Sequence, residues 1–259
     1  MLLTVLNPLV NNPLEQFEII DFLFLSLPVF GFTKLSLTNI GFYSILVVFI
    51  ILAIHLLTSN HYSLIPSRWS ISQESIYGSI LNLVRSSIGP LHEIYVPLIY
   101  SLFVFILVGD LVGLVPYSFT VTSQFALNIG LSTAIFLSVT LIGLQRHGVG
   151  FFAYFIPAGT PLGLVPLLVF IELISYLARA LSLGVRLSAN MIGGHVLLKI
   201  ISTFTWKLLT GGLIMFIVGV LPLLFLVALG ALEFGIACLQ AYVFTILTCT
   251  YIKDAIDLH

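Results

Sequence analysis

Two apolar runs in the C-terminal part of the chain most constrain its fold. They extend over residues 162–204 and 208–251, and each is more than forty residues long. A helix of that length measures about 65 Å, whereas the hydrocarbon core of a membrane is about 30 Å thick. Each run is therefore either two short spans or one long, strongly tilted helix. The second run has only Pro222 and scattered glycines near its middle, so we expect two tilted helices joined in a hairpin around residues 205–207.

The composition indicates an integral membrane protein. Hydrophobic residues make up 59% of the chain and charged residues 7%, whereas soluble domains carry about 25% charged residues. The formal net charge of −1 gives no reason to expect nucleic-acid binding. The first twelve residues contain no Lys or Arg, so they lack the features of a secretory signal or an Arg-rich presequence.

Hydropathy predicts an all-α membrane fold in five parts. These are an N-terminal segment (1–38) with its processing left open, a first transmembrane helix (39–57), a surface amphipathic helix (58–94), a transmembrane helix pair (95–147) and the tilted hairpin with its leading loop (148–259). The surface helix is predicted because apolar residues recur at helical spacing among polar ones, namely Trp69, Ile71, Ile76, Ile80, Leu83 and Val84. A solvated loop is the alternative for that part.

Two arginines lie inside the first long apolar run. An arginine at the centre of a membrane helix costs roughly 2.5–3.5 kcal/mol on insertion scales, so it needs a partner, a water cavity or a function. Arg179 follows Glu172 by seven residues on the same helix face, and a structural ion pair could explain it. Arg186 has no acidic residue within one helical turn. Its position therefore indicates a function.

Polar residues repeat at multiples of seven on both long runs, which places them on one face of each helix. The two stripes consist of Glu172, Arg179 and Arg186 on the first run and of Glu233, Gln240 and Asp254 on the second. Asn190 flanks Arg186 one turn later, whereas His195 points to the opposite face about 13 Å along the helix. Structural alternatives remain open: helix packing for His195, interhelical hydrogen bonding for Gln240 and an ordinary surface charge for Asp254.

These residues lie in segments that resemble subunit a of the F-type rotary ATP synthase, and the fungal mitochondrial form fits best. The resemblance is carried by residues 182–195 and 232–248, with support from 67–74, 115–119, 157–161 and 251–254. It covers nearly the whole chain. It implies a stator of proton translocation, whose two tilted helices lie against a rotating ring of c subunits that each carry one essential carboxylate.

The resemblance also implies a role for each residue. Arg186 matches the essential arginine, and a guanidinium suits a charge barrier because it does not release its proton. The inlet half-channel is implied for His195 and Glu233, with Asn190 beside it. Gln240 matches a hydrogen-bonding partner of the arginine, and the outlet side is implied for Glu172 and Asp254.

Partners and location follow from the same resemblance. The implied partners are the c-ring subunits, peripheral stalk subunit b, other small membrane-sector subunits, the lipid bilayer and protons. The implied location is the mitochondrial inner membrane, with the N-terminus in the intermembrane space. The positive-inside rule agrees, since it places Arg68, Arg85, Arg146 and Lys253 together on the matrix side, opposite Lys34 and Lys207. We expect no cofactor and no metal, and no catalysis by this chain alone.

Three residues depart from the patterns that the resemblance implies. His195 stands where bacterial relatives carry a carboxylate, and Glu233 where they carry a histidine. Asp110 stands where asparagine is expected, and we interpret it as a solvated carboxylate near the interface, with a place in the outer vestibule as the alternative. The alternative function is a secondary proton-coupled transporter, but the inverted repeat common in such folds is not visible in the sequence.

Overall fold

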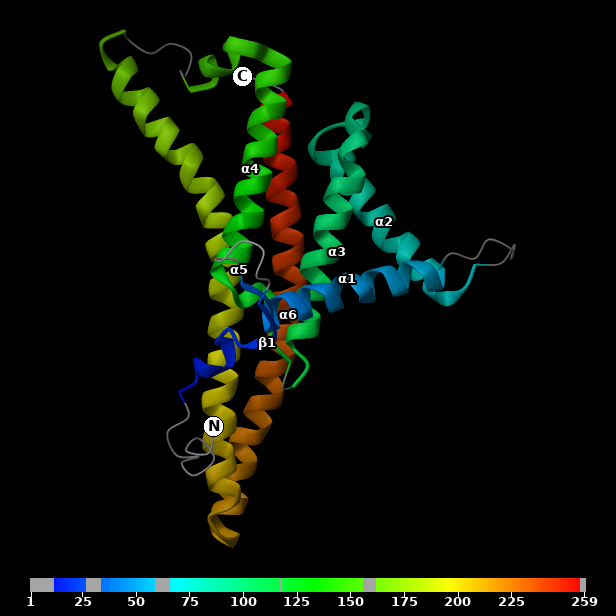
Figure 1. Ribbon diagram of the computed structural model, residues 1–259, viewed down its shortest axis with the longest axis vertical. Helices are drawn as coiled ribbons and strands as arrows, with labels where there is room; N and C mark the ends of the chain where they lie inside the picture. Colours follow the sequence, from blue (N-terminus) through cyan, green and yellow to red (C-terminus); the bar gives the residue numbers. More distant parts are fainter. Residues whose placement is uncertain (1–11, 27–33, 59–65, 117, 156–161, 257–259) are drawn as a thin grey trace.

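The computed structural model describes residues 12–26, 34–58, 66–116, 118–155 and 162–256 (Figure 1). Its helices are α1 (Asn39–Thr58), α2 (Arg68–Ser87), α3 (Val96–Gly113), α4 (Phe125–His147), α5 (Val165–Leu209) and α6 (Leu213–Ile256). Short 3-10 turns are η1 (Glu15–Phe17), η2 (Pro90–Tyr95), η3 (Val121–Ser123), η4 (Gly148–Phe155) and η5 (Leu162–Leu164). The region 157–161 that supported the family resemblance lies outside the described residues, as do residues 1–11, where processing was left open.

The described part of the chain contains five helices that are long and apolar enough to cross a membrane: α1, α3, α4, α5 and α6. The order of a first span, an amphipathic helix, a helix pair and a long hairpin is the predicted one. The all-α membrane fold is therefore confirmed. The loop expected to lead into the hairpin begins with helical turns, since η4 follows directly on α4.

The long hairpin is formed by α5 and α6, which run antiparallel side by side (Figure 1). Each helix is continuous, with 45 and 44 residues, and Pro222 lies inside α6 without ending it. The predicted turn around residues 205–207 is wrong, because α5 continues to Leu209. The chain reverses at Thr210–Gly212, where Gly212 has φ +115°, a conformation that glycine adopts without steric cost.

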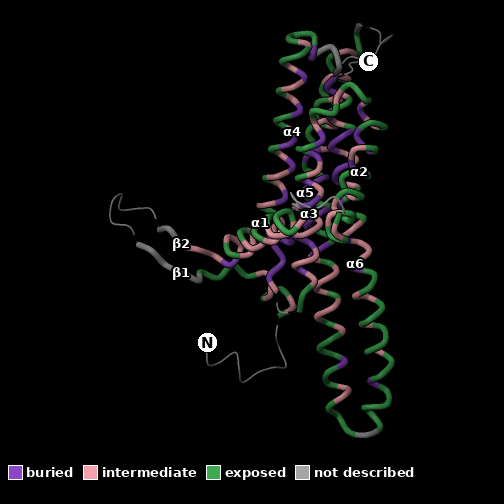
Figure 2. Tube along the Cα trace, turned by 90° about the vertical axis from the view of Figure 1, so that its right-hand side faces the viewer, coloured by how far each residue is buried: buried purple, intermediate pink, exposed green. Residues whose placement is uncertain are grey.

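The buried core lies where α2, α3, α4, α5 and α6 meet, whereas the tip of the hairpin is largely exposed (Figure 2). Ile99, Ile106, Leu187, Phe244 and Ile252 are fully buried there. A methyl group added at Gly184 would lie 2.7 Å from the carbonyl oxygen of Asn128. The backbones of α4 and α5 therefore approach closely, as small residues permit in membrane helices.

The amphipathic helix α2 divides its apolar stripe between two environments. Ile80, Leu83 and Val84 are buried in the core with α3 and α6, whereas Trp69 and Ile71 remain exposed. The stripe was predicted to face a membrane surface along its whole length. For its C-terminal half that prediction is wrong, because the protein itself covers those side chains.

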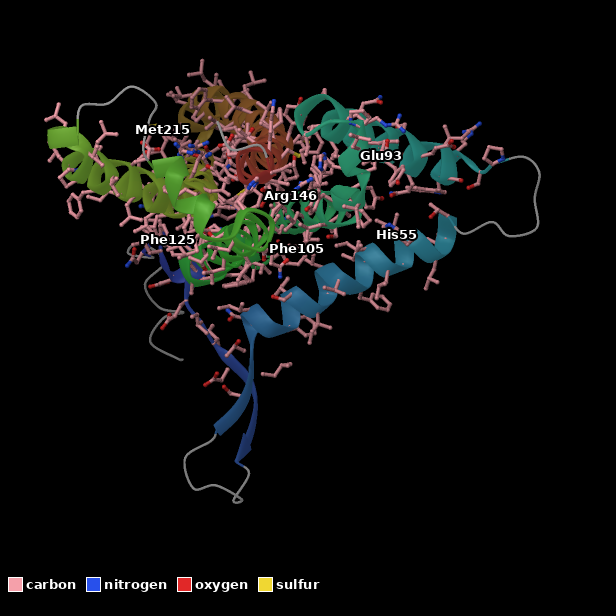
Figure 3. All side chains as sticks on the ribbon, turned by 90° about the horizontal axis from the view of Figure 1, so that it is seen from above. His55, Glu93, Phe105, Phe125, Arg146 and Met215 are labelled. Atoms are coloured by element: carbon pink, nitrogen blue, oxygen red, sulfur yellow. The ribbon has the colours of Figure 1, made fainter. Side chains whose placement is uncertain are left out.

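The N-terminal segment contains a β-hairpin that the sequence analysis did not predict. Strands β1 (Asp21–Ser26) and β2 (Lys34–Thr38) pair antiparallel, and the hairpin extends away from the helices (Figure 3). Asn39 connects its base to α1: the Asn39 amide donates to the Glu18 carbonyl oxygen at 2.9 Å. This contact fixes the segment around η1 against the start of the first span.

Candidate functional site

The polar side chains of α5 and α6 meet in pairs along the interface of the two helices. Because the helices run antiparallel, residues further along α5 meet residues that lie earlier along α6 (Figure 1). The structure brings together His195 with Glu233, Asn190 with Gln240, and Arg179 with Asp254. Arg186 lies between the last two of these pairs along α5.

The first pair belongs to a buried group that we call the His195 cluster, consisting of Thr120, His195 and Glu233. His195 Nε2 lies 3.0 Å from the Thr120 hydroxyl oxygen and 3.7 Å from Glu233 Oε1. The side chains of His195 and Glu233 are 14% and 5% exposed. The Phe17 ring contacts the imidazole edge-on, with ring centroids 6.4 Å apart. The N-terminal segment thus covers one side of the cluster.

Gly194 makes room for the Glu233 carboxyl group. A methyl group at Gly194 would lie 2.6 Å from Glu233 Oε1, so the carboxyl rests directly against the backbone of α5. Neither carboxyl oxygen of Glu233 has a hydrogen-bond partner among the described residues. A buried carboxyl group is costly without hydrogen bonds, so this one requires water or a bound proton. It is therefore placed to receive and release protons.

Gln240 pairs with Asn190, and the predicted contact of Gln240 with Arg186 is absent among the described side chains. The Asn190 amide donates to Gln240 Oε1 at 3.0 Å. The Gln240 amide nitrogen is buried and has no hydrogen-bond partner in the part of the chain that the structure describes. Since an amide oxygen can accept two hydrogen bonds, the role of Gln240 as the hydrogen-bonding partner of the arginine stays a prediction.

Arg186 is exposed on the surface of α5. Its hydrogen-bond partner is the Ser182 hydroxyl, at the long distance of 3.5 Å. Within the described chain no carboxylate lies within 4.0 Å of its guanidinium. Ala189, three residues further along α5, is also exposed. The chain therefore presents an unneutralised cation on the surface of a membrane helix, which is costly unless another group approaches it.

Arg179 instead joins two carboxylates in what we call the Arg179 cluster, consisting of Glu172, Arg179 and Asp254. Its guanidinium lies 3.4 Å from Glu172 Oε1 and 3.7 Å from Asp254 Oδ2, and the three side chains are 30–35% exposed. The structural ion pair considered for Arg179 is therefore present. A cavity of about 20 Å³, large enough for one water molecule, lies beside Arg179, Tyr251 and Asp254.

Arg186 lies between the two clusters along the axis of α5. It follows Arg179 by seven residues and precedes His195 by nine, which corresponds to about 10 Å and about 13 Å along a helix. The described residues therefore contain two polar clusters that the cation separates.

The described residues outside the two clusters include a further cavity. A cavity of about 550 Å³ lies between α1 and α3, but its lining is almost entirely apolar and includes no predicted site residue. Among the described residues, no group of three or more His, Cys, Asp or Glu side chains could hold a metal ion.

The site side chains on the long helices were predictable from the sequence, whereas those that approach from other elements were not. Thr120 and Phe17, which contact His195, lie far from it in the sequence. Asn128 on α4 donates to the Ser188 hydroxyl on α5 at 2.7 Å, and both side chains are fully buried. The only signal in the sequence was the polar character of the turn before α4.

Comparison with known proteins identifies the family. Residues 41–253 match the family described as ATP synthase A chain. The chain belongs to this family. Three fungal relatives are called ATP synthase subunit a. The relative from Mycosarcoma maydis is 55% identical over 97% of this chain and 99% of its own length. Those from Podospora anserina and Kluyveromyces lactis are 51% and 45% identical, over 96% and 98% of this chain and 95% and 100% of their own.

Membership of the ATP synthase A chain family confirms the resemblance that the sequence motifs indicated. The matched region includes nearly all of α1, all of α2 to α5 and most of α6. The His195 cluster's Thr120, His195 and Glu233, Arg186, Glu172 and Arg179 lie inside it, and Asp254 follows its last residue. Together with its five apolar helices in the described region, the family makes this chain a multi-pass membrane protein.

Proposed function

We propose that this chain is the proton-translocating stator subunit of a rotary ATP synthase in the mitochondrial inner membrane. In this proposal a ring of c subunits turns against α5 and α6, and ATP is made elsewhere in the complex. The single observation that carries it is the position of Arg186, an exposed and unneutralised cation between two polar clusters. A ring carboxylate is the partner whose charge fits that site.

The inlet path begins at the His195 cluster. A proton from water on the outer side passes to the imidazole of His195 or to the carboxyl group of Glu233, whose nearest polar atoms lie 3.7 Å apart. From there it passes to a ring carboxylate, which becomes neutral and can turn into the lipid. Asn190 and Gln240 line the way between this cluster and the arginine.

The outlet path begins at the Arg179 cluster. A neutral ring carboxyl group that has completed its turn releases its proton near Glu172 and Asp254, whose partly exposed carboxylates can accept it through water. The ionised ring carboxylate is then attracted by Arg186. Because a guanidinium stays protonated, Arg186 cannot pass a proton directly from inlet to outlet. The membrane potential supplies roughly 2.3 kcal/mol per proton per 100 mV.

The surface of α5 around Arg186 fits a closely packed helix. Small exposed residues lie on both sides of Arg186, namely Ala178, Ser182, Ala189 and Gly193, and the larger Leu181 and Val185 are exposed beside them. Small side chains let the backbones of membrane helices approach. We call these residues together with Arg186 the ring-facing surface. Exposed apolar side chains elsewhere, such as Phe49 and Leu56 on α1, are proposed to contact lipid, subunit b or small membrane-sector subunits.

The proposed orientation puts the C-terminal end of α6 in the matrix and the N-terminus in the intermembrane space. Arg146 at the end of α4 contacts His92 of η2 at 3.2 Å, and the neighbouring His147 contacts the Ile256 carbonyl oxygen at 2.9 Å. The ends of α4 and α6 therefore lie together with Arg85, which pairs with Glu93 at 2.7 Å. Positive charge gathered at one end supports a matrix location for that end.

Cross-linking tests whether the ring turns against this surface. Two alanines on α5 form a matched pair, because Ala189 is exposed beside Arg186 whereas Ala180 is only 5% exposed. The free cysteines Cys238 and Cys249 are first replaced by serine. We expect Ala189→Cys to form a disulfide, under mild oxidation of intact membranes, with a cysteine placed one turn from the ring carboxylate. Ala180→Cys is expected to form none.

The proposal fails if Ala189→Cys forms no cross-link with any cysteine along the ring helix while the complex is fully assembled. Cross-linking of Ala180→Cys with equal yield would also contradict it, because the ring would then approach a face that this chain buries.

A further inference from the structure

Asp110 is a buried acidic residue that the inlet path described above does not use. It lies in the last turn of α3 and was interpreted from the sequence as a solvated carboxylate. That interpretation is wrong, because Asp110 is 0% exposed. Neither of its carboxyl oxygens has a hydrogen-bond partner among the described residues. A carboxyl group in such a position requires water, a bound proton or both.

The chain that follows α3 connects Asp110 with the His195 cluster. The segment around η3 lies against the last turn of α3, since methyl groups added at Gly109 and Gly113 would meet Thr122 Cγ2 at 3.3 Å and Thr120 Cγ2 at 2.5 Å. The Thr122 side chain faces the Asp110 carboxyl group, although the two do not reach hydrogen-bond geometry. Thr120, two residues earlier, contacts His195.

Buried polar atoms without partners gather along this connection. In the described chain they include both carboxyl oxygens of Asp110, the Thr122 hydroxyl, the Asn128 side-chain oxygen and both carboxyl oxygens of Glu233. The Asn128 amide binds the Thr122 carbonyl oxygen, so these groups belong to one region. Buried polar atoms are normally bonded to protein or to ordered water. Their concentration in one place indicates a hydrated path from α3 to α6.

We propose that Asp110 is a further proton-carrying residue of the inlet path, placed before Thr122, Thr120, His195 and Glu233. This proposal rests on the proposed function. In each transfer the Asp110 carboxylate takes one proton from water on the outer side and becomes the neutral acid. It gives that proton through water held by the two threonine hydroxyls to His195 or Glu233, and returns to the carboxylate.

A purely structural role makes a different prediction from proton transfer. Asparagine has nearly the same shape as aspartate and keeps its hydrogen-bonding capacity, but it cannot carry a proton. Glutamate keeps the acid but is longer, and the site is fully buried. If Asp110 carries protons, the variant with glutamate should therefore pump faster than the variant with asparagine. If Asp110 serves packing, the variant with asparagine should pump faster.

The experiment measures ATP-driven proton pumping per assembled complex in inner-membrane vesicles with Asp110→Asn and Asp110→Glu. Removal of a positioned acid or base typically costs about 10²-fold or more, and because water can carry part of the flow we expect Asp110→Asn to slow pumping by at least about tenfold. Asp110→Glu is expected to retain more of the rate than Asp110→Asn.

Normal pumping by Asp110→Asn, or a lower rate for Asp110→Glu than for Asp110→Asn, overturns the proposal. Failure of Asp110→Asn to assemble overturns it as well, because a site that only carries protons accepts an amide of the same shape. Arg186→Ala is measured in parallel. Loss of pumping in that variant together with normal pumping by Asp110→Asn would refute the role of Asp110 alone and leave the proposed function intact.

Discussion

Replacing Arg186 by alanine is expected to abolish ATP-driven proton pumping while the complex still assembles. Removal of one preorganised charge or donor commonly costs about 10²–10³-fold, and here the whole cycle depends on that charge. The side chain is exposed, and among the described residues its hydrogen bond is a 3.5 Å contact with Ser182. Its loss therefore leaves no buried partner unpaired. Pumping is measured as acidification of inner-membrane vesicles, after the amount of assembled complex has been determined.

Two further substitutions separate charge from local packing. Arg186→Lys keeps the charge but offers a compact ammonium group that gives up its proton far more readily than a guanidinium, so we expect most pumping to be lost. Ser182→Ala removes the hydrogen bond of the arginine and keeps its charge, so we expect pumping close to normal. Normal pumping by Arg186→Ala would show that the arginine is structural and that the mechanism proposed for it is wrong.

The second large effect is expected for Glu233→Gln, which should lower both ATP synthesis and ATP-driven pumping by about 10²-fold. Glutamine has the same size and fits the space against Gly194, but it carries no proton. Because Glu233 makes no hydrogen bond to a described residue, the substitution breaks none. The rates of both directions are compared in the same vesicles, since an inlet group serves the same step in each.

Glu233→Asp is the matched control. It keeps a carboxyl group near His195 but shortens the side chain, so proton transfer should be slowed less than in Glu233→Gln. Equal rates for the wild type and Glu233→Gln would remove Glu233 from the path. A larger defect in Glu233→Asp than in Glu233→Gln would indicate that Glu233 serves packing.

Much of the fold was predictable because the thickness of the bilayer sets the length of a membrane-spanning helix. The spans and the long hairpin follow from uninterrupted apolar runs, and the structure has continuous helices there. The turn of the hairpin was misplaced because Trp206 and Lys207 were taken as a break, whereas the break is set by Gly212 and its positive φ. The β-hairpin was missed because its strands are short and paired by backbone bonds that carry little sequence signal.

Helical periodicity made predictable only those contacts of the candidate site that lie within one helix. Spacing by seven placed Arg179 with Glu172 on one face of α5, and the structure pairs them. Contacts from other elements, such as Thr120 on His195, depend on how the turn before α4 folds back. Burial of Asp110 likewise depends on the segment around η3 that covers it. Sequence near a helix end does not reveal which chain segment will cover it.

The central claim is that Arg186 separates two proton paths, and passive proton leak tests it most directly. Leak is measured in vesicles without ATP, under an imposed potential, for Arg186→Ala alone and for Arg186→Ala combined with Glu233→Gln. The account predicts that the single variant leaks, because nothing then blocks flow from inlet to outlet, and that the second substitution suppresses the leak by closing the inlet. Tight vesicles in the single variant, or an undiminished leak in the double variant, would contradict it.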